Sequence, residues 1–104
     1  MNAVGTEMIE QRRWMVLDAI AMQETRDLGE GMILRGVRAY GMPYGAEEVR
    51  NDLILLERAK CVTIDKLPGN GGDVWIAKLT RAGLEVRDCH RTVHGVSSHR
   101  PLSL

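Results

Sequence analysis

The chain has no phenylalanine, only two cysteines and no excess charge of either sign. Two cysteines in 104 residues do not make a disulfide framework, so a reducing cytoplasm is the expected location. The 14 basic and 14 acidic side chains cancel, which argues against indiscriminate binding to polyanions, because phosphate contacts depend on lysine and arginine. No apolar run approaches the roughly 20 residues of a membrane helix. No basic stretch followed by an apolar one marks a secretory signal.

The signatures of common enzyme sites are also missing. The sequence contains no HExxH, no GxSxG and no phosphate-binding loop. Its one glycine cluster, residues 69–72, joins two β-prone runs and does not precede a helix, so it lacks the context of a nucleotide site. The sequence therefore predicts a protein that is not an enzyme and that takes no cofactor.

What is present is the composition of one soluble globular domain, with 44% hydrophobic and 27% charged residues. Apolar side chains recur at helical spacing over residues 7–24 and again over about 33–40. Pro43, flanked by Gly41 and Gly45, predicts a turn after the second segment. A third helix is expected over about 46–60, with Val49, Leu53 and Leu56 on one stripe.

The pattern then changes to that of strands. Residues 61–64 and 74–77 are short β-prone runs, and the glycine-rich stretch between them predicts the loop of a hairpin. Thr80 is a good N-cap for a last helix. Gly83 weakens that helix by about 1 kcal/mol relative to alanine. Trp14 and Trp75 are expected to supply aromatic core volume in a chain without phenylalanine.

The expected order is therefore helix, helix, turn, helix, hairpin, helix. This is the plan of an α+β, mostly α, winged helix-turn-helix fold with a three-helix core, a two-stranded wing at 66–73 and a C-terminal helix. We expect the winged-helix domain to cover residues 1–92 and a C-terminal tail to cover 93–104.

Several motifs occur in the order and spacing of a known family. The run at 31–41 is followed by Val-Arg-Asn-Asp-Leu at 49–53, Val-Thr at 62–63 and Leu-Thr-Arg-Ala-Gly-Leu-Glu-Val at 79–86, with Gly-Val at 95–96 and Arg-Pro at 100–101. In these features the chain resembles small winged-helix proteins of Mu-like phages and prophages, commonly labelled ArsR-like transcriptional regulators. The family usually has serine where Gly45 stands, although glycine is an acceptable N-cap. The resemblance implies a cytoplasmic regulator that binds double-stranded DNA.

Under that hypothesis the third helix enters the major groove and the wing lies along the backbone. Asn51 can pair bidentately with adenine, and arginine and lysine side chains suit guanine or phosphate. The candidate DNA-binding residues are Tyr44, Arg50, Asn51, Ile54, Arg58, Lys60, Lys66, Asn70 and Arg81.

A second hypothesis stays open beside the first. Glu47 and Glu48 make the start of the third helix acidic, and Ile54 and Leu55 are expected to form an exposed apolar pair. These features complement a protein surface better than a phosphate-lined groove. The alternative is a non-catalytic adaptor that uses the same face on a phage or host protein.

Two further patterns concern assembly and metals. Met8, Met15 and Met22 recur every seven residues on the first helix. This spacing favours packing against a second copy and predicts a homodimer. The alternative is that the last helix of the same chain packs on these methionines. Cysteine and histidine, residue types that can bind zinc or nickel, occur together near the end of the chain. They fall where the last helix is expected to fray and lack a carboxylate second shell, so no metal site is predicted. These residues are Cys89, His90, His94 and His99.

Overall fold

The longest helix, α1 (Ala3–Ala21), runs through the middle of a computed structural model that describes residues 3–101. From Trp14 to Ala21 every side chain is buried, because α2, α4, the sheet and the C-terminal segment enclose this half of the helix. A helix that is covered on all sides is mostly apolar all round, and the one charged residue of this half, Asp18, accepts a hydrogen bond from the hydroxyl of Tyr40 and pairs with Arg87. The helix ends three residues before the predicted limit of 24, because Arg26, at φ 57°, turns the chain into a strand.

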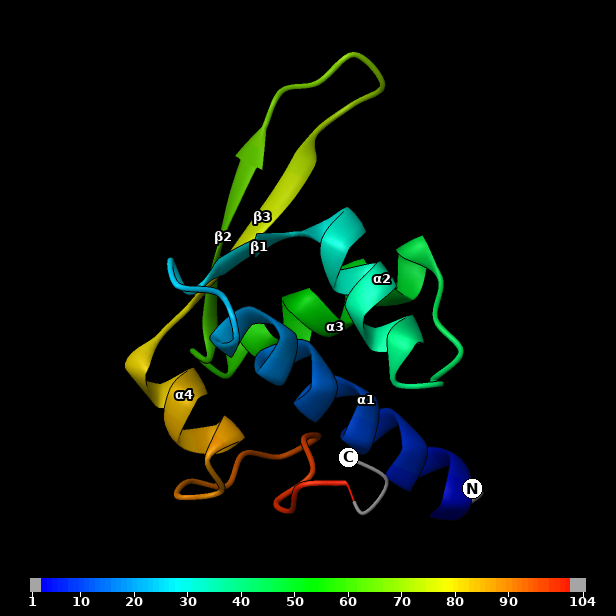
Figure 1. The fold of residues 1–104 in the computed structure, drawn as a ribbon, viewed down its shortest axis with the longest axis vertical. Helices are drawn as coiled ribbons and strands as arrows, with labels where there is room; N and C mark the ends of the chain where they lie inside the picture. The colour runs from blue at the N-terminus through cyan, green and yellow to red at the C-terminus, as the bar shows by residue number, and fades with distance from the viewer. Residues whose placement is uncertain (1–2, 102–104) are drawn as a thin grey trace.

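That strand, β1 (Asp27–Gly29), was not predicted. It is only three residues long and pairs with residues 76–78 of β3 (Val74–Leu79), with Leu28 opposite Ala77. On its other side β3 pairs with β2 (Val62–Leu67), so the sheet is antiparallel in the order β1-β3-β2. Val62, Trp75 and Ala77 point into the core from one face. The outer half of the β2–β3 hairpin projects away from the helices, as Figure 1 shows.

The turn between the next two helices lies where the sequence predicts it. α2 (Glu30–Ala39) stops before Gly41, which adopts φ 88°, and α3 (Ala46–Arg58) begins after Gly45, its N-cap. α3 is two residues shorter than predicted, because Lys60 takes φ 64° and its N–H bonds back to the carbonyl of Glu57. The turn directs the chain into β2.

The last helix, α4 (Arg81–Arg87), is capped as expected, since the Thr80 hydroxyl accepts a bond of 3.0 Å from the N–H of Gly83. Gly83 has a second role that propensity alone does not predict. A Cβ there would overlap the carbonyl of Cys61 and lie 2.8 Å from Cδ1 of Leu79. The glycine lets α4 pack directly on the chain that enters β2.

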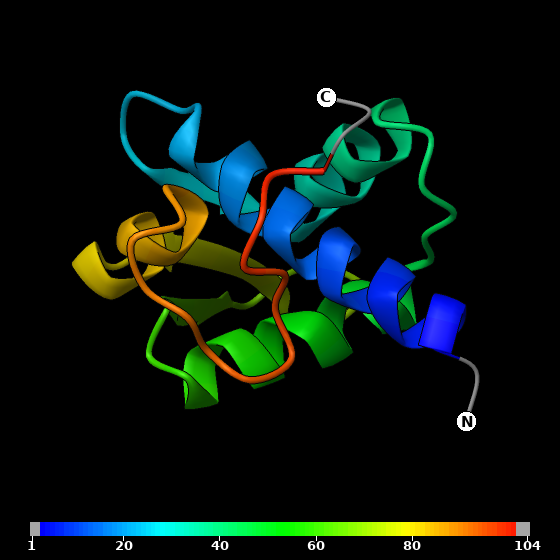
Figure 2. The same ribbon diagram turned by 90° about the horizontal axis from the view of Figure 1, so that it is seen from below.

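The segment expected to be a tail is instead packed on α1, where Figure 2 shows it crossing the helix. Val96 is 5% exposed, the N–H of Ser97 donates to the carbonyl of Glu10, and Arg13 donates to the carbonyl of Gly95. Residues 93–101 are therefore part of the same packed unit as the helices. Residues 102–104 of the predicted tail lie outside the described residues. Across residues 3–101 the chain forms an α+β fold of four helices and a three-stranded antiparallel sheet.

Candidate nucleic-acid interface

α3 turns one face to the core and the other to solvent. Val49, Leu53 and Leu56 are at most 1% exposed, whereas Asn51 and Arg58 are exposed on the opposite side. The buried stripe determines which residues point outward, because a helix repeats every 3.6 residues. The outward face of α3 and the projecting hairpin are the two elements from which an interface with a large partner can be built.

Six of the nine predicted DNA-binding residues lie exposed on α3, the turn after it, the hairpin and the start of α4. A seventh, Ile54, is half-buried against the core. The exposed six are Asn51, Arg58, Lys60, Lys66, Asn70 and Arg81. Within residues 3–101 none of the four cations in this set forms an ion pair with a carboxylate; they are Arg58, Lys60, Lys66 and Arg81. Three of these charges belong to exposed side chains, and the fourth, the Lys66 ammonium, lies over the ring of Trp75.

Tyr44 requires a correction. It was predicted to contact DNA, but its side chain is 5% exposed and lies between α1 and α3. Its hydroxyl donates to Oδ2 of Asp52 at 2.6 Å, and the guanidinium of Arg12 lies 5.0 Å from its ring centre. Burial, together with the neighbouring Asp52 carboxylate, raises the pKa of Tyr44 far above its usual value. The residue belongs to the core of the domain.

Arg50 is likewise held within the chain. Its Nε and Nη2 donate to the two carboxylate oxygens of Glu30 at 2.7 and 2.9 Å, and Nη2 also donates to the carbonyl of Asp73 at 2.7 Å. The bond to Arg50 lowers the pKa of Glu30, whose carboxylate also accepts the N–H of Trp75. Arg50 therefore connects α2, α3 and β3, and it is not a free base-reading side chain in this conformation.

Trp75 completes this junction near the loop end of the hairpin strands, where it pairs with Lys66. The guanidinium of Arg50 lies 4.5 Å from its ring centre and the ammonium of Lys66 lies 4.6 Å from it. Two cations on one indole are each attracted by its π-face. The junction fixes the angle between α3 and the hairpin, because Glu30, Arg50 and Trp75 come from three different elements.

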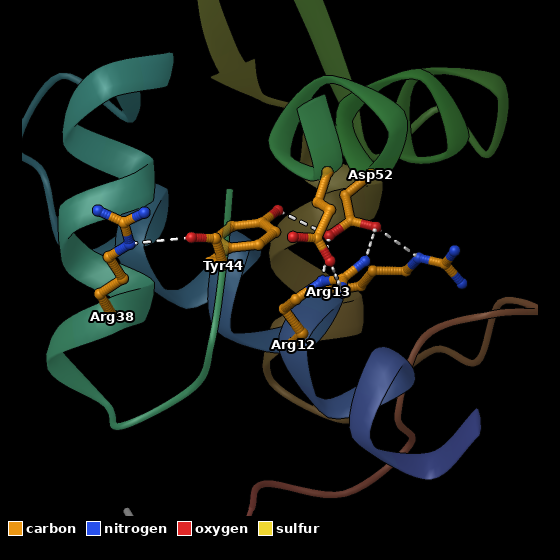
Figure 3. A network of polar contacts seen from close by, with 6 residues as sticks. Arg12, Arg13, Arg38, Tyr44 and Asp52 are labelled. Carbon is orange, nitrogen blue, oxygen red and sulfur yellow. Dashed lines mark hydrogen bonds and ion pairs between the residues drawn. The ribbon is translucent and has the colours of Figure 1, made fainter. Parts of the chain in front are cut away.

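A buried ionic network attaches the other side of α3 to α1, as Figure 3 shows. Asp52 is fully buried and accepts from Nε and Nη2 of Arg12 at 2.7 and 2.8 Å and from Nε of Arg13 at 3.0 Å. The bond to Asp52 raises the pKa of Arg12. On the far side of the ring, Arg38 donates to the carbonyl of Tyr44. Sequence reasoning missed this network, although a carboxylate at position 52, inside the apolar stripe of α3, was a usable signal.

The hairpin carries apolar as well as basic side chains. Leu67 and Val74 face each other across the two strands and are 47% and 46% exposed. The first turn of α3 is acidic, with Glu47 and Glu48 both exposed. These features make the surface mixed in character, with a basic part at the C-terminal end of α3 and on the hairpin.

The three methionines predicted to form one stripe do not do so. Met15 is 2% exposed and packs in the core, so it is removed from the predicted dimer surface. Met8 and Met22 are 42% and 70% exposed at opposite ends of α1. Each borders a different groove, Met8 one beside Met42 and Met22 one beside Met32.

Of the cysteine and histidines near the C-terminus, His94 and His99 line one groove beside the start of α1, and Cys89 and His90 are not among its lining residues. Cys89, His90, His94 and His99 are all exposed. Within residues 3–101 no group of three or more His, Cys, Asp or Glu side chains is arranged to hold a metal ion. In the same part of the chain no helix is long and apolar enough to cross a membrane.

Comparison with known proteins gives no relative: the chain matches no protein-family model, no curated protein and no solved structure.

Proposed function

We propose that the chain is a winged-helix DNA-binding protein, in which α3 enters the major groove and the β2–β3 hairpin lies along the backbone. The observation that carries the proposal is the pairing of an outward α3 face with a projecting hairpin at a fixed angle. Asn51 and Arg58 are exposed on that face, and Lys66 is exposed near the loop end of the hairpin strands. The order of elements and the sheet order β1-β3-β2 agree with this plan.

The proposal keeps the roles that the sequence suggested for Asn51 and four of the cations and, among the cations, changes only that of Arg50. Arg58, Lys60, Lys66 and Arg81 contact phosphates, and Asn51 contacts a base edge. Arg50 acts as a positioning residue that holds α3 beside the hairpin. With few phosphate contacts and a neutral chain, non-specific affinity is expected to be low, so recognition depends on sequence or on two copies acting together.

A salt titration tests the proposal. Fluorescence anisotropy of labelled duplex DNA is measured at several salt concentrations for the wild-type chain and for Arg58→Ala and Lys66→Ala. Each variant should bind more weakly, and the slope of log affinity against log salt should fall by about 1 for each lost phosphate contact. Arg35→Ala is the matched control, since Arg35 borders the groove between α1 and α2, away from the hairpin. Folded protein that binds no duplex at low salt contradicts the proposal.

In the fuller form of the proposal, the protein is a cytoplasmic, phage-type transcriptional regulator that acts as a homodimer. Paired half-sites on DNA usually require two copies. Met8 on α1 and Met22 just after its end are exposed apolar side chains that a second copy would cover. Sedimentation velocity over a range of concentrations tests the dimer, and Met22→Glu should shift the equilibrium toward monomer.

The second candidate function is a protein-binding adaptor. It is favoured by Leu67 and Val74, exposed side by side on the hairpin, and by the acidic first turn of α3. In that case Leu67→Ser would abolish the interaction and Arg58→Ala would leave it intact, which is the reverse of the pattern expected for DNA.

A further inference from the structure

A small groove opens between the N-terminal half of α1 and the chain that leads into α3. Its volume is about 270 Å³, at the lower limit of ordinary ligand pockets, which are roughly 300–1,000 Å³. Apolar side chains make most of its walls, and two charged side chains that contact each other also line it. The lining residues used below are Met8, Ile9, Arg12, Met42, Pro43 and Glu48.

Arg12 brings a buried cation to this groove. Its side chain is 11% exposed, and two of its nitrogens are occupied by the fully buried Asp52. The third nitrogen, Nη1, contacts Glu48 at 3.2 Å, longer than the 2.7 and 2.8 Å bonds to Asp52. One edge of the guanidinium is therefore held by the core and the other is directed toward the groove.

Glu48 is a weakly held partner for that edge. Its side chain is 52% exposed, and an ion pair with a carboxylate that is largely in water contributes little. If Glu48 turns into solvent, Arg12 and Arg13 keep only the carboxylate of Asp52 between them. A second carboxylate in place of Glu48 would restore the balance of two cations and two anions.

The groove also offers a place for the rest of such a ligand. Met8 and Ile9 are 42% and 37% exposed, and Met42 and Pro43 form the opposite wall. Methionine side chains adapt to irregular aliphatic shapes. An aliphatic chain lying there would remove the exposed surface of Met8 and Ile9 from water.

We propose that this groove binds a small aliphatic carboxylate, whose carboxylate group replaces Glu48 on Nη1 of Arg12 and whose chain lies between Met8, Ile9 and Met42. The ligand would act on α3, because Glu48 and Asp52 are one turn apart on that helix and Arg12 bonds to both. Release of Glu48 changes how the first turn of α3 is held to α1. The proposal does not depend on what the outer face of α3 binds.

Hexanoate is a suitable probe, with 1-hexanol as the ligand that lacks the carboxylate. Titrations are followed by NMR, using the Arg12 Nε–H and the methyl groups of Met8 and Met42. Hexanoate should shift these signals in the wild-type protein and 1-hexanol should not. In Glu48→Gln, which keeps the size of the side chain but removes its charge, hexanoate should bind up to about fivefold more tightly, the factor that corresponds to an exposed ion pair.

Two further variants separate the site from general effects. Glu47→Gln removes an exposed charge from the same turn without touching the groove and should leave the affinity unchanged. Met8→Glu places a negative charge at an exposed position in the groove and should abolish binding of hexanoate while the fold persists. The inference is overturned if hexanol binds as well as hexanoate, or if Glu48→Gln binds hexanoate no more tightly than Glu47→Gln. Because DNA is absent from these titrations, their outcome is independent of the salt titration.

Discussion

Replacement of Asp52 by asparagine should destabilise the protein strongly. Asp52 is fully buried. Its carboxylate accepts hydrogen bonds from Arg12 at 2.7 and 2.8 Å, from Arg13 at 3.0 Å and from Tyr44 at 2.6 Å. Asparagine keeps the shape but leaves two guanidinium groups without their buried counter-charge. Loss of one partner from a buried ion pair costs about 3–5 kcal/mol. A domain of this size has a free energy of unfolding of about 5–15 kcal/mol, so the loss is a large fraction of the total.

Urea denaturation followed by tryptophan fluorescence measures this effect, because Trp14 and Trp75 are 0% and 8% exposed and report on the core. Asp65→Asn is the matched control: it is the same substitution at an exposed strand position and should change the free energy of unfolding by no more than about 0.5 kcal/mol. Tyr44→Phe should fall between the two, at about 1.5–3 kcal/mol, since it removes one hydrogen bond to a charged acceptor. If Asp52→Asn lies within about 1 kcal/mol of the wild type, the network does not hold α3 as described.

Three other outcomes are expected. Gly83→Ala should lower the free energy of unfolding by about 1–3 kcal/mol despite the better helix propensity of alanine, because the new Cβ overlaps the carbonyl of Cys61. Gly31→Ala, with open space around it, should instead raise the free energy of unfolding by about 0.4–1 kcal/mol. If thermal denaturation shows that both variants change stability in the same direction, the packing described for Gly83 is contradicted. Glu30→Gln should destabilise the protein most above about pH 5, since the pKa of Glu30 is lowered in the fold below the roughly 4.3 of an unfolded chain, and the difference from wild type should disappear as the pH falls through the folded value; a pH-independent difference in urea midpoint would refute this. A thiol reagent should modify exposed Cys89 quickly and Cys61 only on unfolding, because burial raises the pKa of the Cys61 thiol, and two equally fast thiols in the native protein would be inconsistent with that burial.

The features that sequence predicts well here are local ones. Thr80 caps α4, Gly45 precedes α3 and the glycine-rich stretch joins two strands, because each depends on the conformational preferences of a few neighbouring residues. Strand β1 was missed since three residues carry no periodic pattern, and its existence depends on pairing with β3, almost fifty positions later.

The candidate site shows the same division. Exposure of Asn51 and Arg58 follows from the stripe of α3, which a helical repeat determines. The burial of Tyr44 and the ion pair of Arg50 do not follow from the helical repeat. Their partners, Asp52 and Glu30, depend on how α1, α2 and α3 pack. Met15 was assigned to a surface for a similar reason: a seven-residue spacing does not say which neighbours cover the helix.

Contacts on both sides of α3 hold the helix in place, and this affects how the sequence of its outer face can change during evolution. The contacts that set the position of the helix come from Asp52 on one side and Arg50 on the other, and neither depends on Asn51 or Arg58. Substitutions at positions 51 and 58 can therefore accumulate at little cost to folding. The outer face of α3 can therefore vary while the scaffold beneath it stays the same, and under the proposed function such changes would alter what the protein recognises.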